Sequence, residues 1–444
     1  MENTVTQSPF EMMDMDEAFE LVDKTALEYP KRITQKSIDD IYGYVLAKDV
    51  ISTVNIPPFR ASIMDGYAFK RQEYENETEF TLVDTRSLAG VDDKSIDALP
   101  IPKCSIMYVT TGSPVNPNFD IVIPIELTCK EDEADVQVLS VKSEEKQFFI
   151  KREPVNNDWI RAVGCDISIG QVVLETNTRI GCSEIGILAS IGCTDEIDVF
   201  EKPLIGLAAS GNEIISWKDK TEEGDGKIRD SNTPMLTSIL KSHGFDNIKT
   251  VGIIKDDYES ISSMFKDLSE TCDLIITTGG VSMGAKDLIK PYLIDNGDIL
   301  FGRLNMKPGK PTTFATLNSK LAFSIPGNPV SCFVSAQLLI IRALKIMSGE
   351  TDYVPAEVKV DIPHPLKLDK IRPEYHRVTL YTTPDKSNYQ CISTGNQQSS
   401  RLMSTVTANG FLKLPAQKDY GKEKYDEEHA IAVIIGNVCH KVSI

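Results

Sequence analysis

The chain has 444 residues, of which 41% are hydrophobic and 25% charged, and its formal net charge is −18. At about 150 residues per domain, this length predicts roughly three domains. So acidic a surface repels phosphate backbones and anionic membranes, which excludes general nucleic-acid binding. An anionic ligand would need a local cluster of Lys and Arg.

The nine cysteines are scattered without a CxxC pair, and the five histidines form no HExxH motif. This pattern indicates reduced thiols and no zinc site. The first residues lack the basic start and apolar run of a signal peptide. The longest apolar run, 330–347, contains Gln337, Arg342 and Lys345, which predicts a buried helix and no membrane insertion. We therefore expect a cytoplasmic protein.

The pattern of the sequence changes three times along the chain. Residues 13–50 have helical apolar spacing, which predicts two helices, whereas short alternating stretches predict a β-rich domain over 57–151. Apolar strands alternate with helices over 203–349, as in a parallel sheet covered on both faces, whose ligands bind where the strands end. Short strands with Pro and Gly turns follow over 351–444 and predict a barrel or sandwich.

We therefore expect an α/β multidomain protein. Its central α/β domain, with a mostly parallel sheet, would span 184–350. The β-rich domain (57–151) would be inserted into a discontinuous helical linker domain (1–56 and 152–183), and a C-terminal β-barrel-like domain would span 351–444.

Two Pro-Gly turns, KPGKP and PGNPVS, lie close together between Lys307 and Ser331. Lys307 and Lys310 would direct ammonium groups at one phosphate or oxyanion, and Arg303 would extend that cluster. Pro326 belongs to the second turn, and Pro329 suits the first position of a helix whose free amides would face an anion. The alternatives are a solvated turn and an ordinary well-capped helix start.

The stretch TTGGVSMGAKD directly follows an apolar strand. Gly279 and Gly280 permit a close backbone approach to a ligand, and Thr277, Thr278 and Ser282 add polar groups. A tight strand-to-helix turn would explain the glycines alone. The spacing is not that of a P-loop.

Four carboxylates follow apolar segments at corresponding positions: Glu213, Asp230, Asp256 and Asp287. Oxygen ligands at strand ends suit Mg²⁺ bridged to a phosphate. For Asp256 the alternative is a capping box with Glu259, and for Asp230 it is the cap of the next helix. Ser210, in SGNE, precedes Glu213 at the same strand end.

Candidates elsewhere stand on less specific patterns. Asp65-Gly66 is a turn that would aim the Asp65 carboxylate, or only an Asp-Gly turn. In the last domain, RPEYHR and STGNQQSSRL contain Arg377, Ser399, Ser400 and Arg401, which equally suit exposed barrel loops.

Ten motifs in order carry a resemblance that covers nearly the whole chain from about Asp16. They are PPFRASIMDGYA, VTTGSPV, GCDISIG, SGNEI, IRDSN, TTGGVSMGAKD, MKPGKPTTFATL, IPGNPVS, RPEYHR and STGNQQSSRLMS. This series resembles the MoeA/gephyrin E-domain family of molybdopterin molybdotransferases. The resemblance implies insertion of molybdate into adenylylated molybdopterin, with Mg²⁺-dependent release of AMP, in an elongated homodimer with shared active sites.

The resemblance also implies residue roles. Lys307 and Lys310, with Arg377 and Ser399, would hold molybdate and phosphate. Asp256, Asp287 and Glu213 would bind the metal and assist AMP release. Asp65 and Thr111 would line the cleft from the neighbouring subunit. Ser210, Gly279, Gly280, Ser282, Arg303, Pro326 and Pro329 complete the expected substrate site.

Three further expectations follow from the resemblance. Ala285 stands where the family often has Glu, which would lower metal affinity. No adenylyltransferase domain precedes Met1, so a separate molybdopterin adenylyltransferase is the expected functional partner. The alternative function is a gephyrin-like scaffold for receptor or partner peptides, because Asp16 and Phe19 match part of that family's peptide groove. We favour the simpler interpretation of these two residues, an amphipathic first helix with Phe19 packed inward.

Overall fold

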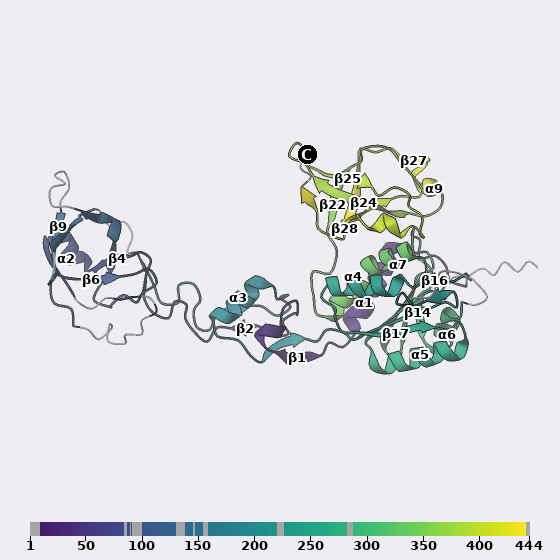
Figure 1. Cartoon of the computed structure of the whole chain (residues 1–444), viewed down its shortest axis with the longest axis horizontal. Helices are drawn as coiled ribbons and strands as arrows, with labels where there is room; N and C mark the ends of the chain where they lie inside the picture. The colour runs from purple at the N-terminus through teal and green to yellow at the C-terminus, as the bar shows by residue number, and fades with distance from the viewer. Residues whose placement is uncertain are drawn as a thin grey trace, which may run out of the picture.

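The structure is a computed structural model of the chain and describes residues 9–83, 87–88, 90, 100–129, 138–144, 147–153, 159–219, 226–281 and 287–440. Ser282 and Ala285, singled out in the sequence, lie outside the described residues. Figure 1 shows an elongated chain. The β-rich domain lies at one end, a small linker domain follows, and the α/β and C-terminal domains pack together at the other end.

The α/β domain contains a six-stranded sheet in the order β17-β14-β18-β21-β20-β19. Its strands are β14 (Ile205–Ser210), β17 (Ile248–Ile254), β18 (Leu274–Thr278), β19 (Asp298–Phe301), β20 (Thr313–Leu317) and β21 (Lys320–Ile325). β17, β14, β18 and β21 run parallel, and β20 and β19 continue the sheet antiparallel. The predicted, mostly parallel sheet is thereby confirmed.

Helices cover both faces of this sheet because its central strands are apolar throughout. The first face carries α1 (Met15–Glu28), α4 (Asn232–Ser242) and the long helix after β21, within one large core. The second carries α5 (Tyr258–Thr271) and α6 (Ile289–Asn296) over a separate core. β14 and β18 are buried at every position, which is why their sequences lack the alternation of a half-exposed strand.

The N-terminal segment differs from its prediction. α1 packs against α8 in the α/β core, so it lies with that domain and apart from the linker domain. Only one of the two helices predicted over 13–50 forms. After Ser37 there is a single 3₁₀ turn, η1 (Ile38–Asp40), and Gly43 at φ +74° turns the chain into extended segments that pair with distant residues.

The long apolar segment forms one continuous helix with a π-helical middle. It comprises α7 (Pro329–Ser335), η3 (Ala336–Ile340) and α8 (Ile341–Met347). By length and composition it is the one candidate membrane span among the described residues, but 78% of it is buried inside the domain. The helix is accordingly a core element of the α/β domain, as the sequence predicts.

The linker domain is built mainly from short paired strands. Its elements are β1 (Ile33–Lys36), β2 (Val50–Ile51), β12 (Val172–Leu174), α3 (Cys182–Ser190) and β13 (Ile197–Phe200). β1 pairs with β13 and β2 with β12. The segments before and after the inserted β-rich domain are therefore paired with each other. Farther out, β3 (Ala61–Ser62) pairs with β11 (Ile160–Arg161) where the chain enters and leaves the β-rich domain.

The β-rich domain contains a seven-stranded sheet in the order β7-β4-β6-β5-β9-β10-β8. Its elements are β4 (Gly66–Phe69), α2 (Arg71–Asn76), β5 (Glu79–Leu82), β6 (Ser105–Val109), β7 (Ile121–Pro124), η2 (Ile125–Leu127), β8 (Thr128–Cys129), β9 (Val138–Lys142) and β10 (Gln147–Lys151). A small aromatic and aliphatic core fills it.

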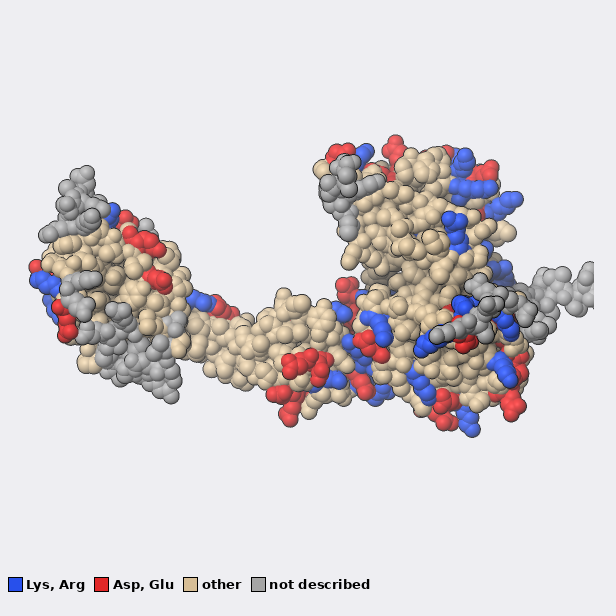
Figure 2. Space-filling view, in the orientation of Figure 1, with Lys and Arg blue, Asp and Glu red and all other residues tan. Residues whose placement is uncertain are grey.

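The C-terminal domain is a closed barrel, because β24 also pairs with β25 and joins the two sides of the sheet. Its elements are β22 (Glu357–Asp361), β23 (Leu366–Lys367), β24 (Glu374–Thr382), β25 (Tyr389–Ser393), η4 (Leu402–Thr405), β26 (Gly410–Leu414), α9 (Gln417–Tyr420), β27 (Lys424–Tyr425), β28 (His429–Ile434) and β29 (Cys439–His440). On the face drawn in Figure 2, acidic and basic side chains are interspersed over this domain and the α/β domain.

Candidate active site at the carboxyl edge of the parallel sheet

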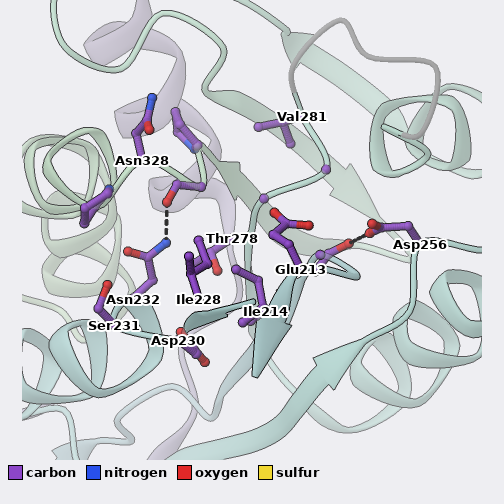
Figure 3. A pocket seen from close by; sticks show the side chains of 18 of the residues that line it. Glu213, Ile214, Ile228, Asp230, Ser231, Asn232, Asp256, Thr278, Val281 and Asn328 are labelled. Carbon is purple, nitrogen blue, oxygen red and sulfur yellow. Dashed lines mark hydrogen bonds between the residues drawn. The ribbon is translucent and has the colours of Figure 1, made fainter. Parts of the chain in front are cut away.

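A cavity of about 670 Å³ lies where the parallel strands end. Because the strands are parallel, the residues that follow β14, β17, β18 and β21 meet at one edge of the sheet. The cavity is lined by predicted site residues from all four loops: Ser210, Glu213, Asp256, Gly279, Gly280, Asp287, Pro326 and Pro329. Figure 3 shows Glu213 and Asp256 on one side of this space.

Asp256 is held in this cavity by hydrogen bonds. Its Oδ1 accepts from Ser210 Oγ (2.6 Å) and its Oδ2 from the Asn212 amide (2.9 Å), as Figure 3 shows for the first of these. The neighbouring Asp257 caps α5, because its carboxylate accepts from the Ser260 amide and hydroxyl. The predicted capping alternative therefore belongs to Asp257, and Asp256 stays with the site.

The two glycines bring the backbone of β18 close to that of β14. Gly279 has φ +86°, and a Cβ on it would lie 2.3 Å from the Ser210 carbonyl oxygen. Gly280 has φ +62°, and a Cβ there would lie 2.9 Å from Ile289 Cδ1. A side chain at position 279 would push the two strand ends apart, and one at position 280 would collide with the Ile289 side chain, so both positions favour glycine.

Glu213, Asp256 and Asp287 line the same cavity, as the strand ends predict. Within the described ranges, no three His, Cys, Asp or Glu side chains come together as a preformed metal site. Mg²⁺ commonly binds through one or two carboxylates together with substrate phosphates. The residues present fit that mode, in which the substrate supplies the remaining oxygens.

A second cavity of about 500 Å³ shares a wall with the first. The shared residues are Pro311, Pro326, Asn328 and Ser400. Lys307, Lys310 and Ser399 line this second cavity, together with Arg372. The two turns that the sequence places so close together therefore form adjacent walls of the site.

Neither Lys310 nor Arg372 in this cavity forms an ion pair with a carboxylate in the described part of the chain, whereas Lys307 does. The pKa of Lys310 is lowered, first by burial and then by the nearby Arg303 and Arg372. An anion at this position would be stabilised by several like charges that otherwise repel one another.

Lys307 has a different environment. Its Nζ lies 2.8 Å from Glu374 Oε2 and 3.4 Å from Asp369 Oδ2, both in the C-terminal domain. Glu374 is only 2% exposed, so this ammonium neutralises a buried carboxylate. Lys307 therefore ties two domains together as well as lining the cavity, an arrangement that the sequence does not predict.

The other predicted anion ligands, Ser399, Arg377 and Arg303, differ in their burial and in whether they line a cavity. Ser399 accepts a hydrogen bond from Asn328 Nδ2 (3.2 Å) at the rim of the second cavity. Arg377 is fully buried in β24, where its Nε donates to Ser404 Oγ (3.3 Å) and burial lowers its pKa to about 10. Arg377 lines neither cavity, and Arg303 donates to the Phe10 carbonyl.

Arg372 and Asn328 line the second cavity but are not among the residues that the sequence singles out. Arg372 lies in RPEYHR and Asn328 in PGNPVS, so the motifs themselves are the signal that could have identified them. The structure gives Asn328 no side-chain cap bond and places its amide across the shared wall, on Ser399.

Three family models match successive parts of the chain. The MoeA N-terminal region (domain I and II) matches residues 13–192, a probable molybdopterin binding domain matches 206–346, and the MoeA C-terminal region (domain IV) matches 359–423. The chain belongs to the MoeA family. The first cavity is lined mainly by the second of these regions, and the second cavity lies between the last two.

Curated relatives span bacteria and eukaryotes. A gephyrin from Dictyostelium discoideum is 33% identical over 96% of this chain, and the molybdenum cofactor synthesis protein cinnamon from Drosophila melanogaster is 31% identical over 88%. This chain spans 63% of the length of each of those two proteins. A molybdopterin molybdenumtransferase from Staphylococcus epidermidis is 29% identical, with 85% of this chain and 86% of that protein covered.

The MoeA fold is also found among solved structures. A MoeA protein from Pyrococcus horikoshii OT3 superimposes with a TM-score of 0.72 at 23% identity, covering 96% of this chain and all of that one.

Two predicted site residues of this MoeA-family chain lie far from both cavities. Asp65 and Thr111 are in the β-rich domain, where Asp65 Oδ1 accepts from the Thr111 amide (2.6 Å) and hydroxyl (2.9 Å). These bonds lower the pKa of Asp65. Figure 1 places their domain at the opposite end of the molecule from the α/β domain. Gly66 is needed because a Cβ on it would lie 2.0 Å from the Ile123 carbonyl oxygen, which is a different reason from the predicted turn.

A small groove of about 250 Å³ lies beside α1 and is lined by residues of the α/β and C-terminal domains. Asp16 and Phe19 line it, with Arg342 and Tyr375. Phe19 is half-buried: its ring packs against the α/β core, and the Arg342 guanidinium lies 4.8 Å from its centroid. Phe19 thus contributes to the core and still presents one face to the groove.

Proposed function

We propose that this protein is a molybdopterin molybdotransferase, which inserts molybdate into adenylylated molybdopterin and releases AMP as the last step of molybdenum cofactor biosynthesis. The observation that carries the proposal is the shared wall between a carboxylate-lined and a cation-lined cavity at the edge of the parallel sheet. A pyrophosphate with its metal suits the first cavity, and an oxyanion suits the second. The relatives named as molybdopterin molybdenumtransferases support this assignment.

The reaction asks for positioning and charge stabilisation. The two sulfurs of the dithiol bind molybdenum, and one molybdate oxygen leaves as water together with the two thiol protons. Cleavage of the pyrophosphate consumes one water and yields AMP. Lys310 and Arg372 would hold molybdate close to the dithiolene, and the glycines after β18 would let the substrate approach the backbone.

Mg²⁺ is part of the proposal. Asp256 and Asp287, with Glu213 at the rim, would hold it, and it would neutralise charge on the departing phosphate. Asp256 is preorganised for this role, because Ser210 and Asn212 fix its carboxylate before any ligand arrives.

We further propose a cytoplasmic homodimer that receives its substrate from a separate molybdopterin adenylyltransferase. The separation of Asp65 and Thr111 from the cavities within one chain supports a shared site, because only a second copy would bring these residues to the substrate.

The test is reconstitution with purified full-length protein, adenylylated molybdopterin, molybdate and Mg²⁺. The product is scored by activation of a molybdenum-free molybdoenzyme, and AMP is measured separately. We expect both products only when all three additions are present. A well-folded protein that binds the adenylylated pterin yet yields no active cofactor would contradict the proposal.

The groove beside α1 supports a second candidate function, the binding of a partner peptide. Its apolar floor, with Phe19 and Tyr375, is bordered by charges of both signs, including Asp16 and Arg342. A Phe19→Ala variant should lose such a peptide while keeping transferase activity, because the groove and the cavities do not share residues. Isothermal titration against peptides recovered with the wild-type protein would decide this.

A further inference from the structure

Two buried acceptor atoms on one wall of the first cavity have no partner in the described part of the chain. They are Asp230 Oδ2 and Asn232 Oδ1. Asp230 is 4% exposed and Asn232 is 7% exposed, and both side chains line the cavity. Figure 3 shows them on the same side of the space, away from Asp256. Buried polar atoms without a partner are costly, so their presence at a cavity wall indicates a ligand that donates to them.

The second polar atom of each side chain is already hydrogen-bonded within the protein, and this determines which atoms the wall offers to a ligand. Asp230 Oδ1 accepts a hydrogen bond from the Thr233 amide (3.0 Å) and so caps the start of α4. This is the structural role that the sequence predicts for Asp230 as the alternative to metal binding. Asn232 Nδ2 donates to the Gly327 carbonyl (2.9 Å), which turns its Oδ1 the other way. The wall therefore offers two acceptors and requires a ligand edge with adjacent donors.

Resting on the proposed function, we propose that Asp230 and Asn232 bind the aminopyrimidinone edge of the pterin. That edge carries two neighbouring donors, the ring N3–H and the 2-amino group. Adenine, the other ring of the adenylylated substrate, alternates donor and acceptor along its edges and would meet an acceptor with an acceptor. Ile214 and Ile228 line the same cavity and supply apolar contact for a flat ring.

This placement orders the substrate across the site. The pterin edge lies at the α4 wall, and the Asn232–Gly327 bond connects that wall to the PGNP turn shared with the second cavity. The pyrophosphate then extends toward Asp256 and Asp287 on the opposite side. Asp230 and Asn232 would be specificity-determining residues that touch the substrate away from the bonds that change.

The experiment measures binding of three probes to the full-length protein by titration calorimetry. The probes are 6-hydroxymethylpterin phosphate, its 3-methyl analogue, which lacks the N3–H donor, and AMP with Mg²⁺. Asp230→Asn keeps the shape and the acceptor for Thr233 but presents an amide donor to the ligand. Ser238→Ala, a change at an exposed position of α4 that does not line the cavity, is the matched control.

In the wild-type protein, 3-methylation should weaken pterin binding by about 10- to 100-fold, as expected for one lost charge-assisted hydrogen bond. Asp230→Asn should weaken binding of the unmethylated pterin by a similar factor and abolish the discrimination, with AMP binding unchanged. Ser238→Ala should bind all three probes like the wild type.

Two results would overturn the inference in distinguishable ways. If the wild type binds both pterins equally and Asp230→Asn weakens AMP instead, the α4 wall serves adenine and the proposed function stands. If the wild type binds AMP and neither pterin, the proposed function fails together with the inference. The methylated probe tests the unaltered protein, so the outcome does not depend on the folding of a variant.

Discussion

Ser210 Oγ donates a 2.6 Å hydrogen bond to Asp256 Oδ1 and thereby joins the ends of β14 and β17 across the floor of the first cavity. The carboxylate is thus oriented toward the cavity by the scaffold itself. Its sequence neighbour, Asp257, points away and caps α5. Two adjacent aspartates therefore have separate tasks, one chemical and one structural.

The first prediction uses this pair. Asp256→Asn retains its contacts, because the amide can accept from Asn212 and donate to Ser210, but it removes the charge. We expect at least a tenfold rise in the Mg²⁺ concentration that gives half-maximal AMP release, with stability unchanged. Asp257→Ala should instead lower the free energy of unfolding by about 1 kcal/mol and leave the Mg²⁺ dependence intact. Urea unfolding and Mg²⁺ titrations check both, and equal behaviour of the two variants would remove Asp256 from the metal site.

The second prediction separates two lysines of one motif. Lys310→Ala should raise the molybdate concentration for half-maximal transfer by about 10- to 100-fold, because an unpaired cation is lost. Lys307→Ala leaves the buried Glu374 without its ammonium and should lower the free energy of unfolding by about 2 kcal/mol.

Stability and molybdate dependence are measured on both variants. If Lys310→Ala unfolds more readily than Lys307→Ala and uses molybdate normally, the assignment of the two cations is reversed.

The third prediction concerns the stability of the fold at acidic pH. Asp273 accepts hydrogen bonds from Arg32, Tyr29 and the Leu204 amide. Burial acts to raise its pKa, but these bonds outweigh it and hold the pKa at about 2, below the ordinary 3.8. The stabilisation is thus complete above pH 4 and is lost as the pH falls toward 2, amounting to about 2 kcal/mol.

Asp273→Asn should therefore be less stable than wild type at pH 7 by that amount, and the difference should shrink between pH 4 and pH 2. Glu201→Gln, which alters the exposed partner of Arg32, is the control and should have a small effect. A stability gap that stays constant down to pH 2 would contradict the linkage. Urea titrations at several pH values give the answer.

The fourth prediction tests the shared site. Asp65→Ala and Lys310→Ala proteins should each be weakly active, and mixed dimers should regain activity, with a statistical limit of one intact site in each heterodimer. Co-expression with two different affinity tags isolates the heterodimers for assay. Isolated heterodimers no more active than their parents would place Asp65 outside the partner's site.

Much of the site could be predicted from the sequence because parallel strands place their following loops at one edge. Glu213, Asp256 and Gly279 are far apart in the chain, yet each directly follows an apolar strand, so their convergence follows from the topology. The barrel was predictable as a class, although its closure through β24 and β25 depends on a long-range pairing that local patterns do not encode.

The failures have physical causes as well. Asp256 and Asp257 are indistinguishable by local spacing, since either can start α5, and only the position of Ser210 decides between them. The ion pair of Lys307 joins residues 67 positions apart in different domains. The extended segments after η1 replace a predicted helix because their apolar residues, such as Leu46, complete the linker core. Tertiary contacts override helical spacing there.

The central claim is that pyrophosphate cleavage and molybdenum transfer occur together in one site. The most direct measurement is the number of AMP molecules released per molybdenum bound to pterin, in a single turnover at saturating molybdate. We predict a ratio of one for the wild type, and for Asp287→Asn the same ratio at a slower rate, because the charge assists the departing phosphate and leaves molybdate binding intact. AMP release that proceeds at full rate without any molybdenum transfer, or a normal rate in Asp287→Asn, would contradict the account.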